Sequence, residues 1–254
     1  MKDREVWLRE RLNTILVATD FHQNSHLALE YAAGLARQFG GKVTVLNAFQ
    51  FGPYSQTVEI VEHVPSRERI NAQERLKEFT AEAGLDDILA KEAVVEGFVP
   101  SAIIKKLYEL DVDLLVVGTE GLHRGLDHLL LGSNTEALML GAHRPTLTVG
   151  PLVPELLDRN IACERVIYIS DLSVASIAAA AYAAGLGDVF EAEVEVHQLV
   201  SKATIEEPSR LRSAAAQYCD LLRFAASLPP SPAANRIPHA SGLRHRDTAA
   251  RFCP

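Results

Sequence analysis

The alternation of strand-like and helix-like segments over the first 150 residues is the strongest constraint on this fold. Residues 14–19 (TILVAT) and 114–117 (LLVV) are nearly unbroken apolar runs, which are typical of strands buried on both faces. After the first run, apolar residues recur at helical spacing, at Leu27, Tyr31, Leu35 and Phe39. Gly40 and Gly41 then predict the end of that helix.

The same alternation continues to residue 149. Further strands are expected at 43–46, 93–95 and 146–149. Further helices are expected at about 66–84, 102–110 and 133–141. Strands that alternate with helices build parallel sheets, because each helix returns the chain to the same end of the sheet. The sequence therefore predicts the α/β class, with a doubly wound, five-stranded parallel sheet over residues 12–151.

An internal repeat appears when the chain is compared with itself at a shift of 151 residues. Residues 15–21 (ILVATDF) align with 166–172 (VIYISDL), and the sequence YAAGL occurs at both 31–35 and 182–186. The second copy is incomplete, because no counterpart of residues 114–117 follows it.

The end of the chain differs in composition from the rest. A helix is expected at about 209–228, but residues 229–254 hold five of the twelve prolines and show no periodicity. We therefore expect three parts: a complete domain at 1–151, a partial second copy at 152–228 and a disordered tail at 229–254.

Composition also limits the partners and the compartment. The formal net charge of −8 disfavours nucleic acid, because a phosphate backbone requires a basic surface. No stretch reaches the ~18 apolar residues that a membrane span needs, and the charged N-terminal residues lack the apolar core of a signal peptide. The three cysteines are far apart in the sequence, which favours a reducing cytoplasm.

The loop between the strand at 114–117 and the helix at 133–141 is the most informative segment for function. Ligands of open α/β sheets bind outside the carboxyl ends of the strands, at a topological switch point. Glycines there let backbone N–H groups approach a phosphate, and a helix N-terminus adds partial positive charge. Ser133 and Thr135 add hydroxyl donors. An alternative remains open, in which Gly118 and Gly121 only form a tight turn and Ser133-x-x-Glu136 is a capping box.

Several motifs together resemble the universal stress protein family. Residues 118–133 resemble the nucleotide loop of its ATP-binding members, G-x2-G-x9-G-[S/T], and residues 18–21 (ATDF) resemble its first strand-to-helix junction. Residues 97–100 (GFVP) and 113–119 (DLLVVGT) also look like the family. The resemblance is to a tandem-type member with an incomplete second repeat, and it implies an adenine-nucleotide α-hydrolase-like, Rossmann-like fold.

The resemblance implies an ATP-binding regulator with little or no catalysis, with Mg²⁺ accompanying the phosphates. Thr19 and the backbone of Ala48 would border the base, Asp20 would lie near the ribose or the metal, and Arg124 could pair with a phosphate. The alternative for Asp20 is a helix N-cap. The expected nucleotide-binding residues are Ala18, Thr19, Asp20, Ala48, Gly118, Thr119, Gly121, Arg124, Gly132, Ser133, Asn134 and Thr135.

The loop departs from the family pattern in one respect. Ten residues separate Gly121 from Gly132 where the pattern has nine. The extra residue either bulges outward at His123-Arg124 or displaces the glycines from the phosphates. In the second case the protein would be an interaction module without a nucleotide. A third hypothesis, an adenylate-forming enzyme, lacks a second set of catalytic residues.

Other ligand motifs are absent from the sequence or incomplete. The chain has no Walker A, G-x-G-x-x-G or G-x-S-x-G pattern. His22 and His26 straddle the expected helix start without an obvious third ligand, which disfavours a metal site.

The strand at Thr146–Val149 is expected at the sheet edge, where unpaired backbone groups can accept another strand. In the family resembled here, two domains pair through this strand, and the partial copy lacks its own. We therefore expect a homodimer through Thr146–Val149, with residues 163–228 packed as a satellite and with a protein partner that the sequence does not identify. The alternative is a monomer in which the partial copy covers the edge.

Overall fold

The computed structural model describes residues 2–50, 67–119, 132–153, 156, 161–171, 173–199, 216 and 249–250. These residues belong to two compact units, one formed by residues 11–161 and one that joins residues 1–10 to residues 162–254. We call them the first unit and the second unit, and describe each by itself.

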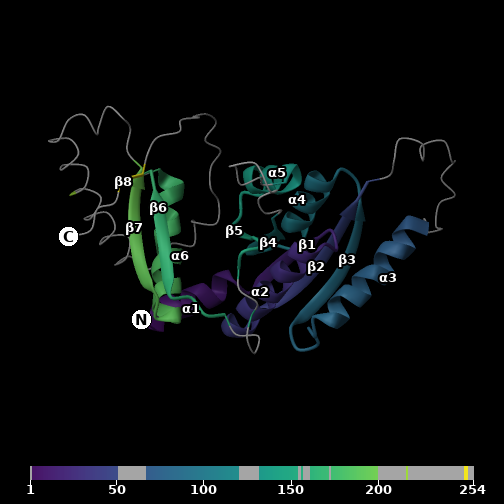
Figure 1. Cartoon of the computed structure of the whole chain (residues 1–254), viewed down its shortest axis with the longest axis horizontal. Helices are drawn as coiled ribbons and strands as arrows, with labels where there is room; N and C mark the ends of the chain where they lie inside the picture. Colours follow the sequence, from purple (N-terminus) through teal and green to yellow (C-terminus); the bar gives the residue numbers. More distant parts are fainter. Residues whose placement is uncertain are drawn as a thin grey trace. The chain divides into compact units, whose positions relative to one another are not determined.

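The first unit contains a five-stranded parallel sheet with helices between its strands (Figure 1). Its elements are β1 (Thr14–Thr19), α2 (Gln23–Phe39), β2 (Lys42–Phe49), α3 (Arg67–Glu82), β3 (Leu89–Glu96), α4 (Val99–Glu109), β4 (Leu114–Gly118), α5 (Ser133–Gly141) and β5 (Thr146–Val149). The strand order is β3-β2-β1-β4-β5. The predicted doubly wound sheet is confirmed, with β4 between β1 and β5.

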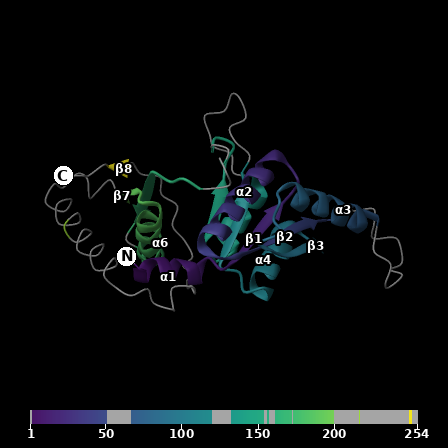
Figure 2. The same cartoon turned by 90° about the horizontal axis from the view of Figure 1, so that it is seen from below.

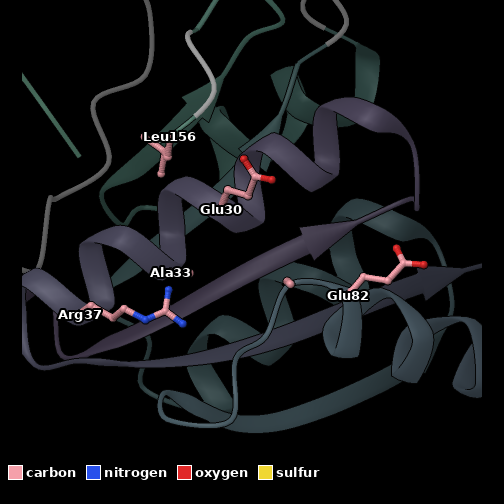
Figure 3. Close-up of a pocket in the computed structure, with 6 residues that line it drawn as sticks. Glu30, Ala33, Arg37, Glu82 and Leu156 are labelled. Atoms are coloured by element: carbon pink, nitrogen blue, oxygen red, sulfur yellow. The ribbon is translucent and has the colours of Figure 1, made fainter. Parts of the chain in front are cut away.

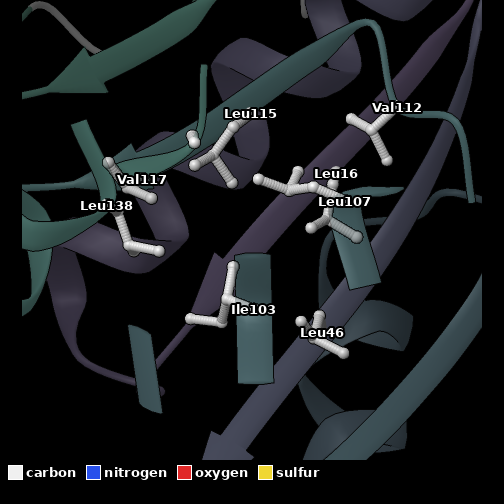
Figure 4. Packing of buried hydrophobic residues seen from close by; sticks show 9 residues of the cluster. Leu16, Leu46, Ile103, Leu107, Val112, Leu115, Val117 and Leu138 are labelled. Carbon is white, nitrogen blue, oxygen red and sulfur yellow. The ribbon is translucent and has the colours of Figure 1, made fainter. Parts of the chain in front are cut away.

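Helices cover both faces of this sheet. Side chains of α4 and α5 pack on the face that contains Leu16, Leu46 and Leu115 (Figure 4). The opposite face contacts α2 and α3 (Figure 2), and Ile15 and Val17 of β1 are fully buried there. Burial of β1 on both faces explains why its sequence shows no alternation of apolar and polar residues.

Helix boundaries follow local chemistry. Gly40 ends α2 in the left-handed conformation, with φ +75°, and its N–H donates to the carbonyl of Ala36, so the predicted helix end is confirmed. Helix α4 begins at Val99, earlier than the expected start at residue 102, because Pro100 is tolerated in a first helical turn.

The second unit contains a β-α-β segment that repeats the order of elements at the start of the first unit. Strand β6 (Arg165–Ser170), helix α6 (Val174–Phe190) and strand β7 (Glu193–Leu199) follow each other, and β6 and β7 are parallel. β6 and α6 have the bounds of β1 and α2 displaced by 151 residues. The strand register is displaced equally, since Thr14 lies opposite Lys42 and Arg165 lies opposite Glu193. A short strand, β8 (Ala249–Ala250), pairs antiparallel with β7.

Helix α1 (Lys2–Arg11) packs on α6, although the expected first domain began at residue 1. The rings of Trp7 and Tyr182 meet edge to face, with centroids 4.8 Å apart. Leu8 is fully buried, and a Cβ at Gly185 would lie 2.6 Å from its Cδ1 atom. Arg4 and Asp188 form an ion pair at 3.1 Å. Trp7 and Leu8 therefore belong to the core of the second unit.

Some expected features lie outside the described residues. They are almost all of a loop expected at residues 50–65, almost all of the helix at 209–228, and the tail at 229–254 apart from β8. Of the helices that the structure describes, none has the length and apolar character needed to cross a bilayer.

Candidate functional site

The carboxyl ends of β1, β2 and β4 bring most of the sequence-predicted residues to one edge of the sheet. Ala18 lies opposite both Leu46 of β2 and Val117 of β4. The residues at and just after these positions therefore lie at the same end of the sheet. They are Ala18–Asp20, Ala48 and Gly118–Thr119. Crossovers leave β1 and β4 toward opposite sides of the sheet. This edge is therefore the topological switch point, where open α/β proteins bind ligands.

The turn after β1 is held by side chains of its own residues. The N–H of Phe21, which has φ +66°, donates to Oγ1 of Thr19 at 2.9 Å. Oδ1 of Asp20 accepts the N–H of His22 at 3.0 Å and the hydroxyl of Ser25 at 2.7 Å. The N-cap of α2 is His22 rather than Asp20, and it has no side-chain cap bond. Asp20 thus stabilises the turn before the helix while its side chain stays exposed.

Packing within the protein requires Gly118. A Cβ at this position would lie 2.6 Å from the carbonyl oxygen of Asn24 and 2.9 Å from the amide nitrogen of Ser25. Both atoms are backbone atoms in the first turn of α2. Gly118 thus lets α2 approach the end of β4, whatever its role toward a ligand.

The start of α5 is open where Gly132 caps it. Gly132 is the N-cap residue and has no side-chain cap bond, so Ser133 does not occupy the N-cap position that the alternative capping box requires. Among the described residues, a Cβ at Gly132 would meet nothing closer than Oγ1 of Thr135, at 4.0 Å. Ser133 and Asn134 are exposed. The first N–H groups of α5, which have no partner within the helix, lie at the switch point.

Two of the expected hydroxyls are engaged inside the protein. Thr135 is buried and its hydroxyl donates to the carbonyl of Gly118 at 3.5 Å, which ties α5 to the end of β4. Thr119 is also buried, and its hydroxyl donates to the carbonyl of Val149 at 3.4 Å. Gly121, Arg124 and the ten-residue spacing before Gly132 lie outside the described residues.

Sequence reasoning missed two residues that shape this edge. Asn47 is buried at the end of β2 and donates from Nδ2 to the carbonyl of Thr19 at 2.8 Å. Ser25 is buried and holds Asp20 as described above. A polar residue near the end of an apolar strand, as in KVTVLNAF, was the available signal for Asn47.

An aromatic cluster fixes α3 to the turn after β1. The Phe79 ring lies edge to face with Phe21 at 5.8 Å and close to His26 at 4.3 Å. The Arg75 guanidinium lies 4.4 Å from the Phe21 ring centroid, a cation–π distance. The His26 ring is thus part of a packing cluster. Within the described residues, no group of three His, Cys, Asp or Glu side chains could hold a metal ion.

A pocket of about 240 Å³ lies elsewhere, between α2 and the end of α3 (Figure 3). Glu30, Arg37, Glu82 and Leu156 are among its lining residues. Arg37 also forms an ion pair with Asp87 at 3.0 Å. None of the residues that line this pocket belongs to the carboxyl edge.

The fold and this edge define a doubly wound α/β protein with a glycine-flanked helix N-terminus at its switch point. Comparison with known proteins identifies the class more closely. The sequence model of the universal stress protein family matches residues 12–150. The chain belongs to the universal stress protein family.

Named relatives cover the same part of the chain. It is 26% identical over 140 residues to universal stress protein MJ0531 of Methanocaldococcus jannaschii, covering 53% of this chain and 80% of that protein. It is 30% identical over 140 residues to a putative universal stress protein of Staphylococcus aureus strain USA300. This match covers 53% of this chain and 82% of that protein.

Among solved structures, the chain is similar to a universal stress protein from Archaeoglobus fulgidus in complex with dAMP. The identity is 22%, the TM-score is 0.40, and the match covers 54% of this chain and 97% of that one. The chain is also similar to a universal stress protein in complex with cAMP. The identity is 23%, the TM-score is 0.40, and the match covers 54% of this chain and 96% of that one.

Proposed function

We propose that this protein is an ATP-binding regulatory protein of the stress response, with little or no catalysis, that acts in the cytoplasm. The observation that carries the proposal is the open start of α5 beside the end of β4. Gly132 has free space at its Cβ position and no side-chain cap, whereas the glycine at 118 is required by packing. A phosphate accepts hydrogen bonds from such a helix N-terminus.

The proposed nucleotide lies along the carboxyl edge. Its phosphates accept hydrogen bonds from the N–H groups at the start of α5 and from the exposed Ser133 and Asn134. Its base lies by Ala18, Thr19 and Ala48. Thr119 and, outside the described residues, Gly121 and Arg124 are also proposed to bind the nucleotide.

Asp20 is proposed to lie near the ribose or near a Mg²⁺ ion bound to the phosphates. Its Oδ1 atom already accepts two hydrogen bonds, and the residue is exposed. Carboxylate oxygen is a normal Mg²⁺ ligand. Asp20→Asn retains an oxygen for His22 and Ser25 but removes the charge. Its ATP affinity should therefore lose its dependence on Mg²⁺ while the fold is retained.

Isothermal titration calorimetry of the full chain with ATP tests the proposal. Gly132→Val should weaken binding at least about tenfold, or about 1.4 kcal/mol, because its side chain would occupy phosphate space. Gly132→Ala, with its smaller side chain, should give an intermediate affinity. AMP, cAMP and dAMP complete the panel. Absence of ATP binding by the unmutated protein at millimolar nucleotide would refute the proposal and favour an interaction module without nucleotide.

We also propose that residues 152–228 are an incomplete second copy of the domain at 1–151. The equal bounds of β1 and β6 and of α2 and α6, and the equal register of the strand pairs β1-β2 and β6-β7, support it. A homodimer through β5 is the proposed assembly, because β5 is at the sheet edge in the described strand order.

A further inference from the structure

The carboxylate of Asp20 is held by a side chain of the helix that follows it. Its Oδ1 atom accepts the hydroxyl of Ser25 at 2.7 Å, in addition to the N–H of His22 at 3.0 Å. A hydroxyl that donates to a carboxylate makes a charge-assisted hydrogen bond, which is stronger than a bond between neutral groups. The turn therefore takes up one of the two carboxylate oxygens of Asp20.

Ser25 is buried, although Asp20 is exposed. Ser25 is the third residue of α2, which begins at Gln23, and only 5% of its surface is accessible. Burial of a hydroxyl is unfavourable unless the group is hydrogen-bonded. The Ser25 hydroxyl also accepts the N–H of Asp20, at 3.4 Å. Both its donor and its acceptor capacity are thus used by Asp20.

Packing against β4 fixes the backbone of Ser25. A Cβ at Gly118 would lie only 2.9 Å from the amide nitrogen of Ser25, so the first turn of α2 contacts the end of β4 closely. The hydroxyl that holds Asp20 is therefore carried by backbone whose position the sheet determines. Ser25 lies between Asp20 and Gly118, which are on the two sides of the carboxyl edge.

The residue before Asp20 is fixed from the other side. Asn47 of β2 donates from Nδ2 to the carbonyl of Thr19 at 2.8 Å, and Oγ1 of Thr19 accepts the N–H of Phe21 at 2.9 Å. The backbone around Asp20 is thus held by two strands and its own turn. What remains free is rotation within the Asp20 side chain, and the bond from Ser25 restricts that rotation.

The second unit provides a comparison for this turn. Asp171 and Ser176 are the counterparts of Asp20 and Ser25, displaced by 151 residues. Oδ1 of Asp171 accepts the N–H of Ser173 at 2.9 Å, and hydrogen bonds from Ser173 lower the pKa of Asp171 more than the bond from Ser176 does. The hydroxyl of Ser176 donates to the carbonyl of Ser173 at 2.9 Å. Asp171 is therefore held chiefly by Ser173.

The first unit has His22 at the position of Ser173, and histidine has no hydroxyl. Ser173 caps α6 by accepting the N–H of Ser176 at 3.2 Å, whereas α2 has no side-chain N-cap bond. Ser25 thus performs for Asp20 the task that the N-cap serine performs in the second unit. Among the described residues of the second unit, no strand corresponds to β4, so the bond from Ser25 accompanies the complete carboxyl edge.

We propose that Ser25 is a positioning residue of the nucleotide site, whose hydroxyl holds the Asp20 carboxylate in the orientation that binds the Mg²⁺ ion of Mg-ATP. This inference rests on the proposed function. A carboxylate that is oriented before the ligand arrives loses less conformational freedom on binding, which increases affinity. Ser25 itself is buried and acts through Asp20.

Calorimetry of the full chain with ATP, in the presence and absence of Mg²⁺, tests the proposal. Ser25→Ala should weaken binding about tenfold with Mg²⁺, a loss typical of removing a hydrogen bond to a charged group. It should leave binding without Mg²⁺ unchanged. In an Asp20→Asn background the same substitution should have no further effect, because the charge that it positions is already removed. An equal loss with and without Mg²⁺ would indicate a structural role only and would overturn the proposal.

Ser176→Ala is the matched control, since it makes the same change at the counterpart position. It should leave the affinity for ATP unchanged under both conditions. If it reproduced the loss seen in Ser25→Ala, the effect would come from weakening a helix start rather than from Asp20, and the proposal would be wrong.

A measurement on the free protein separates this proposal from nucleotide binding itself. Three-bond NMR couplings across the Cα–Cβ bond of Asp20 should report one rotamer in the unmutated protein and averaging over several rotamers in Ser25→Ala. Absence of ATP binding by the unmutated protein would refute the proposed function. Couplings of Asp20 that are the same in both proteins would instead refute the positioning role of Ser25.

Discussion

A glycine-to-alanine substitution should affect stability differently at Gly118, which packing requires, and at Gly132, which is proposed to face a phosphate. At Gly118 the new Cβ would lie 2.6 Å and 2.9 Å from two backbone atoms of α2, and neither can rotate away. Either the first turn of α2 or the end of β4 must move. Overpacking of this kind costs about 1–3 kcal/mol, so Gly118→Ala should lower the unfolding free energy of the first unit by that amount.

At Gly132 the same change should have little effect on stability. The nearest atom would be 4.0 Å away, and φ −54° and ψ 146° suit an L-residue. Alanine is a poorer N-cap than glycine by roughly 0.5–1 kcal/mol, but it reduces the entropy of the unfolded chain, which stabilises by about 0.4–1 kcal/mol. We expect the two effects to offset within about 0.5 kcal/mol.

Urea unfolding followed by far-UV circular dichroism measures both variants. With a slope of about 1–3 kcal/mol per molar urea, the midpoint for Gly118→Ala should fall by about 1 M relative to Gly132→Ala. Trp7, the one tryptophan in the chain, lies in the second unit, so its fluorescence provides an internal control. Equal midpoints for the two variants would refute the packing role of residue 118.

Three further predictions test other parts of the structure. Leu8→Ala should lower the stability of the second unit by about 2–5 kcal/mol, because Leu8 is fully buried, and Trp7 emission should shift to the red at lower urea. Burial raises the pKa of Asp113, although the N–H of Thr14 donates to its Oδ2 at 2.9 Å. The folded state therefore holds that proton more tightly than the unfolded state, and this contribution to stability falls as pH rises from the ordinary aspartate pKa through the raised one. Asp113→Asn should remove that fall, as urea titrations at pH 4 and pH 7 would show. Residues 145 and 149 bond β4 through their carbonyl groups, so Thr146 and Thr148 direct their N–H groups to the free edge of β5. Thr148→Pro should therefore convert the proposed β5 dimer to a monomer in light scattering, whereas an unchanged dimer would place the interface elsewhere.

The strands of the first unit were predictable because a strand that is buried on both faces has apolar residues at successive positions. The runs at β1 and β4 are nearly unbroken apolar sequences, and both strands lie in the interior of the sheet. Helix α1 gave no such signal. Its buried residues, Trp7 and Leu8, are adjacent rather than three or four apart, and Val6 beside them is 54% exposed.

The candidate site was predictable in position but not in detail. The strand order brings the carboxyl ends of β1, β2 and β4 together, and the position of each of these ends was predicted from the sequence. It could not show that the hydroxyl of Thr135 is engaged with Gly118, or that the backbone of α2 leaves no room for a side chain at residue 118. Both facts depend on how closely two helices approach one strand, which residue spacing does not encode.

The pairing of α1 with α6 affects the order in which the chain can fold during synthesis. Helix α1 leaves the ribosome before α6, which follows more than 160 residues later. Until then Trp7 and Leu8 have no partner surface from their own unit, and they must stay exposed or be shielded by a chaperone. Truncated chains should show the same effect. A fragment of residues 1–151 would keep α1 without α6, whereas a fragment of residues 11–161 would omit both and should be the less prone to aggregate.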